Sequence, residues 1–164
     1  MYSDESIVVD LLKKLGMSVT TVESCTGGLV ASKIVNVPGA SDVFSQGYIT
    51  YSDSAKCNMV GVSADVIRRF GVVSREVAQD MALKGTIKAG TECAISTTGV
   101  AGPDGGDEMN PVGTVYIACK VPCGCEVKRF KFEGDRQEVR NSAALMAINM
   151  LRNGLESERA YIGL

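Results

Sequence analysis

Segments with helical periodicity alternate with segments typical of β-strands along most of this chain, and this alternation is the feature that most limits its fold. Apolar residues recur at helical spacing over residues 6–15, and residues 17–22 then follow a strand pattern. After Asp135 a long helical pattern carries an apolar stripe formed by Val139, Ala143, Ala144, Ala147, Ile148 and Leu151. Helices alternating with strands predict an α/β fold, a three-layer α/β/α sandwich around a mixed β-sheet.

The same patterns give the expected bounds of the other elements. We expect a short helix capped by Ser52 and a longer helix that begins after Ser74 and ends at Gly90, with Val77, Met81, Ala82 and Ile87 on its inner side. Two further helices are expected over residues 27–35 and 64–70. The expected strands cover 17–22, 43–51 and 93–96, followed by a hairpin formed by 114–120 and 126–132.

The length of the chain suits one domain. A chain of 164 residues can bury roughly 70% of the surface that it exposes when unfolded, which is enough for a hydrophobic core. We therefore expect a single domain over residues 1–164, with its core in residues 6–153.

Charge and hydropathy argue against two classes of protein. The chain has 17 basic and 19 acidic residues and a net charge of −2, which is unlike a protein that coats nucleic acid. It shows no apolar run of membrane-spanning length, and it begins with acidic rather than basic residues. We therefore expect no nucleic-acid or membrane partner, and a cytoplasmic location.

Six cysteines are scattered through the sequence, a pattern that favours reduced thiols over a disulfide framework. Three of them, Cys119, Cys123 and Cys125, surround a predicted turn. Without histidine, a metal site there would need further cysteine or carboxylate ligands. We interpret the three side chains as small apolar groups at a turn, and we expect no metal.

Ser24 stands where a predicted strand meets a predicted helix, in the segment Thr21-Val22-Glu23-Ser24-Cys25-Thr26-Gly27-Gly28. Backbone N–H groups at a helix start attract anions or a developing oxyanion, so a hydroxyl at this place resembles a nucleophile. The chain contains no histidine, so the base that activates Ser24 must be a lysine, a tyrosine or a carboxylate. Lys56 is one such candidate, but sequence spacing alone does not select it.

A second unusual segment is the glycine-rich loop at residues 99–106, which has four glycines directly after a predicted strand. It matches neither a Walker loop nor a G-x-G-x-x-G fingerprint, so it is either a flexible surface loop or a ligand-binding edge. Arg136 and Arg140 lie four residues apart at the start of the last helix. They could together grip a phosphate or carboxylate, or they could pair with neighbouring acids at the surface.

Six segments in one order resemble the CinA C-terminal domain family, which includes the nicotinamide mononucleotide deamidases often called PncC. The resemblance covers about residues 6–153. The segments are Glu23-Ser24-Cys25-Thr26-Gly27-Gly28, Tyr51-Ser52-Asp53-Ser54-Ala55-Lys56, Gly71-Val72-Val73-Ser74, Thr98-Gly99-Val100-Ala101-Gly102-Pro103-Asp104-Gly105-Gly106, Pro111-Val112-Gly113-Thr114-Val115, and Gly134-Asp135-Arg136 with Arg140.

The resemblance implies a cofactor-free amidohydrolase of pyridine-nucleotide recycling that converts nicotinamide mononucleotide to nicotinate mononucleotide and ammonia. It implies that Ser24 and Lys56 are the catalytic pair, joined by an arginine that we assign to Arg140, with Arg136 as the rival. Asn110 departs from the family because a basic residue commonly stands at this position, and the exchange is expected to weaken phosphate binding. The sequence lacks the molybdopterin-binding-like domain that some members carry, so we expect no pyrophosphatase activity.

The substrate contacts that we expect come from three places in the sequence. Backbone N–H groups of the serine turn would stabilise the oxyanion, the glycine loop with Arg140 would hold ribose and phosphate, and two tyrosines assigned to one strand face would stack on the pyridine ring or orient Lys56. The expected substrate-binding residues are Thr26, Gly27, Gly28, Tyr48, Tyr51, Thr98, Gly99, Ala101, Gly102, Gly105 and Arg136.

Two other functions remain open at this point. The chain could be a non-catalytic nucleotide-binding or regulatory protein of the competence-damage-inducible family, or a Ser–Lys amidase for another small amide. We also expect a homo-oligomer, because an apolar hairpin at the edge of a short domain is suited to pairing with a second copy.

Overall fold

The computed structural model describes residues 3–163 and contains one five-stranded sheet. The strands follow the order β2-β1-β3-β4-β5, in which β1 pairs in parallel with β2 and β3, while β4 pairs antiparallel with β3 and β5. Their bounds are β1 Val19–Glu23, β2 Gly47–Ile49, β3 Cys93–Gly99, β4 Thr114–Val121 and β5 Gly124–Lys131. The mixed sheet that the alternating pattern predicts is confirmed.

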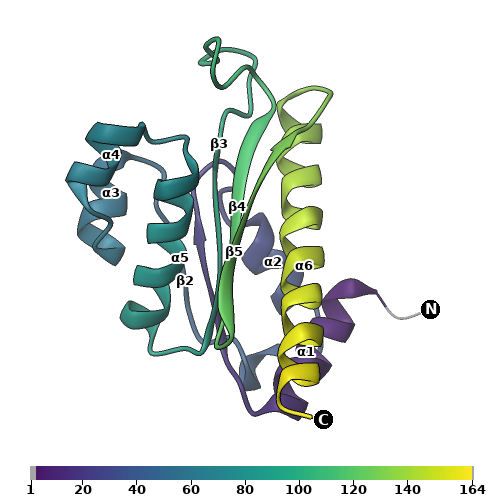
Figure 1. Cartoon of the computed structure of the whole chain (residues 1–164). Coiled ribbons are helices and arrows are strands. Elements are labelled where there is room, and N and C mark those ends of the chain that lie inside the picture. Colours follow the sequence, from purple (N-terminus) through teal and green to yellow (C-terminus); the bar gives the residue numbers. More distant parts are fainter. Residues whose placement is uncertain (1–2, 164) are drawn as a thin grey trace.

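Helices cover both faces of this sheet, so the three-layer α/β/α prediction is confirmed as well (Figure 1). One face carries α1 (Asp4–Leu15), α2 (Leu29–Val35) and α6 (Arg136–Tyr161), and the large core lies beneath them. The other face carries α3 (Asp53–Ala55), the π-helical turn η2 (Lys56–Val60), α4 (Ala64–Phe70) and α5 (Arg75–Ala89). Within residues 3–163, none of the helices combines the length and the apolar character needed to cross a membrane.

The helix ends follow the chemistry expected from the sequence. Gly16 ends α1 in the left-handed conformation, with φ +63°. Ser74 caps α5 by accepting the N–H of Val77, and Asp135 with Glu138 forms a capping box at the start of α6. The apolar stripe predicted for this last helix is buried along its whole length.

Two predictions about individual elements were wrong. The strand expected over residues 43–51 is reduced to β2, because a 3₁₀ turn, η1 (Ala40–Asp42), leads into Val43, which is buried in the core. Its apolar side chain therefore fills the core and does not extend a strand. Ile87, expected on the inner side of α5, is 78% exposed. Gly85 on this helix packs against Val22 of the sheet. Ile87 lies two residues further along, about 200° around the helix from Gly85, and therefore faces away from the sheet.

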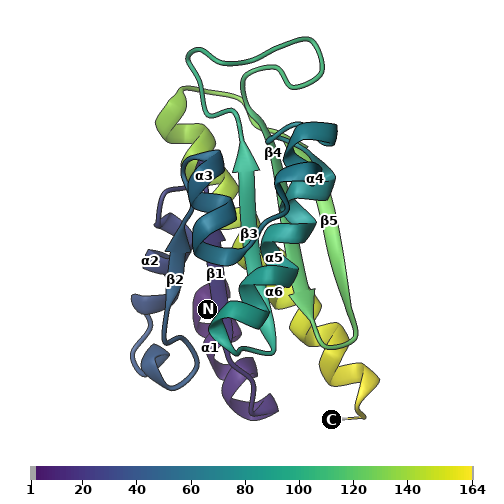
Figure 2. The ribbon, with the colours of Figure 1, turned by 90° about the vertical axis from the view of Figure 1, so that its left-hand side faces the viewer.

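The sheet order places a crevice where the chemistry was expected. From β1 the chain passes through α2 to β2 on one side, and it returns through α5, on the opposite face, to β3 on the other side of β1. In open α/β sheets, ligands bind outside the carboxyl ends of the strands at such a switch point. Figure 2 shows that α3, the start of α6 and the loop after β3 all gather at this end of the sheet.

Candidate active site

Ser24 lies in the turn that joins β1 to α2, and it is 9% exposed. Its backbone N–H donates to the carbonyl of Thr97 in β3 at 2.9 Å, which attaches the turn to the carboxyl end of the neighbouring strand. Gly27 and Gly28 have φ values of +58° and +99°, a region that residues with a Cβ rarely occupy. The two glycines therefore let the chain reverse sharply after Ser24.

Glu23 accounts for the shape of this turn, and the sequence reasoning missed it. Its carboxylate is 1% exposed and accepts the N–H groups of Gly28, Val30 and Ala31 at 2.8–3.0 Å. It also accepts the hydroxyl proton of Thr26 at 2.6 Å. The start of α2 is thus capped from within the chain. A charged residue that ends a strand just before a helix is the signal that could have revealed this.

The glycine amides of the turn are consequently engaged. The Gly27 N–H donates to Ser24 O at 3.1 Å, and the Gly28 N–H donates to Glu23. Within residues 3–163, the N–H groups of Cys25 and Thr26 have no hydrogen-bond acceptor outside their own residues. The donors closest in sequence to Ser24 are therefore the ones that remain for an oxyanion, and the glycines instead shape the turn.

We expect the substitution Glu23→Gln to lower the free energy of unfolding by about 2 kcal/mol, because one carboxylate oxygen becomes an NH₂ group that faces the N–H donors of α2. Urea denaturation measures this change. Glu92→Gln is the matched control, since Glu92 accepts the Ser18 N–H and hydroxyl at an exposed site, where the loss should be smaller. Equal stability of Glu23→Gln and the parent chain would contradict the capping role of Glu23.

Lys56 approaches Ser24 from the other side of the cavity. Ser52 begins α3 by accepting the Ala55 N–H, and the chain then passes into the π-helical turn η2, a conformation that is frequent at functional sites. The Lys56 side chain is 1% exposed. Its Nζ lies 3.1 Å from Ser24 Oγ and donates to Thr50 O at 2.9 Å. The structure thus places this lysine beside Ser24, which spacing alone could not predict.

Burial lowers the pKa of the Lys56 ammonium, because the charged form is poorly solvated there. The nearby carboxylate of Asp53 acts in the opposite direction. A lowered pKa increases the fraction of neutral amine, which is the form that can accept a proton from Ser24. Cys25 behaves differently, since burial raises the pKa of its thiol to about 12. At neutral pH this thiol stays protonated and is a poor nucleophile.

Ser24 and Lys56 share a cavity of about 290 Å³ at the carboxyl ends of β1 and β3. Nine of the expected site residues line it, namely Ser24, Lys56, Tyr51, Thr98, Gly99, Ala101, Gly102, Gly105 and Arg136. Five others lie outside its lining, namely Thr26, Gly27, Gly28, Tyr48 and Arg140. The sequence reasoning did not single out two carboxylates of the lining, Asp53 and Asp104, because an acidic residue in a polar loop also suits a cap or a solvated surface.

The two arginines at the start of α6 have separate roles. Arg136 donates to Gly102 O at 2.7 Å and to the Tyr51 hydroxyl at 2.8 Å, so it joins the glycine loop to the segment before α3. Arg140 donates to Cys25 O at 3.0 Å and to Thr26 O at 3.1 Å, so it holds the serine turn. The sequence allowed a joint grip on one anion, but in the structure each guanidinium is engaged with different protein groups.

The assignment of Tyr48 and Tyr51 to one strand face was wrong. The side chains of a strand alternate with period two, so residues three apart point to opposite faces, and β2 in any case ends at Ile49. Tyr48 packs against the core cluster that contains Val22 and Met81. Tyr51 is 61% exposed and lines the cavity.

The glycines of the loop allow close packing within the protein. A Cβ at Gly99 would lie 2.5 Å from Thr114 O, and one at Gly106 would lie 2.6 Å from Val112 N. Such distances are too short for a real side chain, so the end of β3 can pack on the start of β4, and the loop on the segment before it, only with glycine at these places. The loop is thereby fixed above the ends of the strands as a wall of the cavity.

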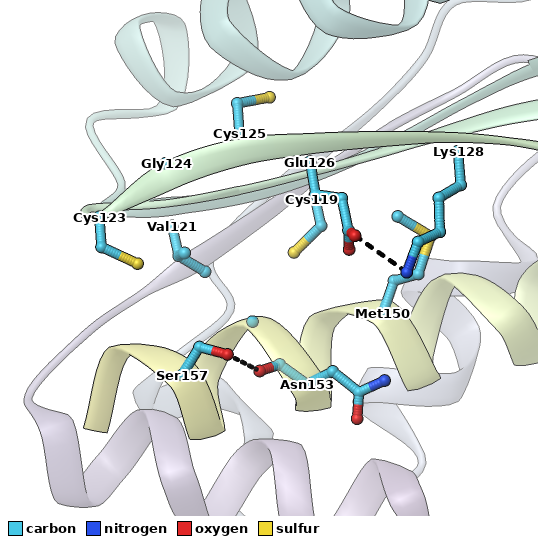
Figure 3. Close-up of a pocket in the computed structure, with 11 residues that line it drawn as sticks. Cys119, Val121, Cys123, Gly124, Cys125, Glu126, Lys128, Met150, Asn153 and Ser157 are labelled. Carbon is cyan, nitrogen blue, oxygen red and sulfur yellow. Dashed lines mark hydrogen bonds and ion pairs between the residues drawn. The ribbon is translucent and has the colours of Figure 1, made fainter. Parts of the chain in front are cut away.

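A larger cavity, of about 440 Å³, lies between α6 and the β4–β5 hairpin (Figure 3). It contains the three cysteines of the predicted turn, but Cys119 faces the core beneath α6 while Cys125 packs on the opposite face of the sheet. Cys123 lies at the turn, where its thiol donates a hydrogen bond to the Glu158 carboxylate, which raises the pKa of the thiol. No activated nucleophile lines this cavity among residues 3–163, so Ser24 and Lys56 mark the better candidate for catalysis.

Together, the sheet and the site define a three-layer α/β domain with a buried serine–lysine pair at its switch point. The chain belongs to the CinA C-terminal domain family, whose model matches residues 2–155. Two solved structures with nearly the same fold are a CinA superfamily protein from Klebsiella pneumoniae (TM-score 0.89, 32% identity, 94% of this chain and 96% of that one) and a competence/damage inducible protein from Agrobacterium tumefaciens (TM-score 0.88, 34% identity, 95% and 97%).

Curated relatives are closer in sequence but longer. A CinA-like protein from Kosmotoga olearia is 48% identical over 151 residues, and one from Geotalea uraniireducens is 43% identical over 156 residues. These matches cover 92% and 95% of this chain but only 37% of each relative. The chain therefore corresponds to a little over a third of the length of these curated relatives.

Proposed function

We propose that this chain is an amidohydrolase that converts nicotinamide mononucleotide and water to nicotinate mononucleotide and ammonia. The observation that carries the proposal is the fully buried Lys56 amine, 3.1 Å from Ser24 Oγ, in a chain without histidine. A buried lysine beside a serine hydroxyl supplies a base and a nucleophile in one contact. Membership of the CinA C-terminal domain family and the resemblance of the motifs to the deamidases support the choice of substrate.

In the proposed first step, Ser24 Oγ attacks the carboxamide carbon while the neutral amine of Lys56 takes the hydroxyl proton. The resulting tetrahedral intermediate collapses, and the ammonium of Lys56 gives its proton to the amide nitrogen as the C–N bond breaks, so that ammonia leaves. In the second step, water attacks the nicotinoyl ester on Ser24, again with Lys56 accepting a proton. The C–O bond to the serine breaks as the Lys56 ammonium returns its proton to Ser24 Oγ, and nicotinate mononucleotide leaves. No oxidant or reductant enters either step.

The oxyanion of this intermediate would be stabilised by the N–H groups of Cys25 and Thr26, a contribution of about 3 kcal/mol for each well-placed donor. Arg140 supports this arrangement indirectly. Because it binds the Cys25 carbonyl at 3.0 Å, it fixes the plane of the Cys25–Thr26 peptide. In a trans peptide the N–H points away from the carbonyl, so Arg140 sets the direction of the Thr26 N–H.

The proposal is tested by measuring ammonia release from nicotinamide mononucleotide by the parent chain. We expect stoichiometric ammonia and nicotinate mononucleotide, with activity increasing toward alkaline pH as Lys56 loses its proton. A non-catalytic nucleotide-binding protein would instead be stabilised against thermal unfolding by the compound and would release no ammonia. An amidase for another substrate would release ammonia only from other members of a panel of small amides.

A further inference from the structure

The charged side chains that line the proposed active-site cavity include two carboxylates, those of Asp53 and Asp104. The cations in the lining are Lys56 and Arg136. Burial favours the neutral form of the lysine, and the arginine already donates to a backbone carbonyl and to a tyrosine hydroxyl, at 2.7 and 2.8 Å. The cavity therefore offers two carboxylates against one guanidinium, two of whose five N–H groups are already used within the protein.

The helix starts around the cavity are also satisfied by the chain itself. Glu23 accepts three N–H groups at the start of α2. Asp135 accepts the N–H groups of Gln137 and Glu138 at the start of α6, and Ser74 caps α5. An uncapped helix start attracts phosphate through its unpaired N–H groups and its dipole. Ser52 likewise caps the short α3, so two of the four starts are neutralised by carboxylates and the others are capped by hydroxyls, and they provide little attraction for a phosphate dianion.

We infer that this cavity recognises the positively charged pyridinium ring and the ribose hydroxyls of a nicotinamide nucleoside, and that the phosphate contributes little. Carboxylates attract a cation, accept hydrogen bonds from ribose hydroxyls and repel a phosphate dianion. The inference rests on the proposed function, because it uses the same attack of Ser24. Nicotinamide riboside and water are then converted to nicotinate riboside and ammonia in the same two steps.

The test compares kcat/KM for nicotinamide mononucleotide and nicotinamide riboside in the parent chain, with ammonia release as the signal. We expect the two values to lie within about tenfold of each other. A preference of more than tenfold for the mononucleotide overturns the inference and leaves the proposed function intact. Ammonia from neither compound refutes the proposed function, and the inference with it.

A second measurement assigns the recognition to a carboxylate. Asp104→Asn removes one negative charge from the lining, so we expect kcat/KM for the riboside to fall about fivefold and the ratio of mononucleotide to riboside to rise. Glu108→Gln is the matched control, since Glu108 is exposed in the same loop but does not line the cavity. A ratio that stays the same in Asp104→Asn overturns the role given to the carboxylates.

A complementary variant adds a cation at the rim of the cavity. Asn110 Nδ2 donates to Val73 O at 3.0 Å, and Val73 lines the cavity. We expect Asn110→Lys to raise kcat/KM for the mononucleotide several-fold and to leave the value for the riboside nearly unchanged. A parent chain that already prefers the phosphate-bearing mononucleotide strongly would gain little from Asn110→Lys. An unchanged kcat/KM for the mononucleotide in this variant therefore also counts against the inference.

Discussion

The substitution Ser24→Ala is expected to reduce kcat/KM for the deamidation of nicotinamide mononucleotide by at least about 10³-fold, with little effect on stability. The loss follows from the proposed route, because without Oγ no nicotinoyl ester forms and only direct attack by water remains. Ser24 is 9% exposed, and removing one hydroxyl at the edge of the cavity leaves the packing of the turn intact. Ammonia release under steady-state conditions, together with thermal unfolding, measures both effects.

The matched control for this experiment is a substitution of the neighbouring residue, Cys25→Ser. Cys25 lines the same cavity, and its pKa of about 12 keeps the thiol protonated. We therefore expect this variant to retain activity within about tenfold of the parent chain. If Ser24→Ala is fully active, Ser24 is not the nucleophile.

Where local chemistry decides a structural feature, the sequence was a sufficient guide. The caps at Ser74 and Asp135 and the end of α1 at Gly16 follow from interactions within a few residues, and the apolar stripe of α6 follows from its own helical spacing. The strand expected over residues 43–51 failed because Val43 is apolar for a reason that lies elsewhere, in the core beneath α1 and α2. A short apolar segment cannot by itself distinguish these two causes.

The candidate site likewise combines features that short segments of the sequence reveal with contacts between residues far apart in the chain. The strand-to-helix turn at Ser24 and the glycine loop could be recognised locally, whereas the contact with Lys56 joins residues 32 positions apart. Arg140 lies 115 positions from Cys25, so its grip on the turn follows from the tertiary fold alone. The ordered motifs pointed to both arginines, but only the structure distinguishes Arg136, which lines the cavity, from Arg140, which holds the turn.

The substitution Lys56→Met is expected to abolish the deamidation while it raises the free energy of unfolding by about 1 kcal/mol at pH 7. Burial lowers the pKa of Lys56 in the folded protein below its ordinary value of 10.5. Folding therefore either displaces a proton or buries a charge, and both cost free energy. Methionine has nearly the same length, fills the same space and avoids this cost.

The pH dependence of the free energy of unfolding tests the cost of burying Lys56 more strictly than the change in that free energy at a single pH. At pH values between the lowered pKa of Lys56 in the folded protein and its ordinary pKa of 10.5, the unfolded state binds more protons than the folded state. Over that range the free energy of unfolding of the parent chain therefore increases with pH. The Met variant lacks this contribution, so its advantage is largest at low pH and disappears as the pH passes 10.5. Urea denaturation across this range measures the difference.

Two control variants separate the buried amine from general effects of lysine removal. Lys88→Met removes an exposed lysine of α5 and should change stability by no more than about 0.5 kcal/mol. Lys56→Arg keeps a positive charge that cannot be lost, so we expect an inactive protein that is less stable than the parent chain. An active Lys56→Arg variant would exclude a neutral amine as the base, whereas a Met variant that is less stable at every pH would show that the Lys56 amine stabilises the fold.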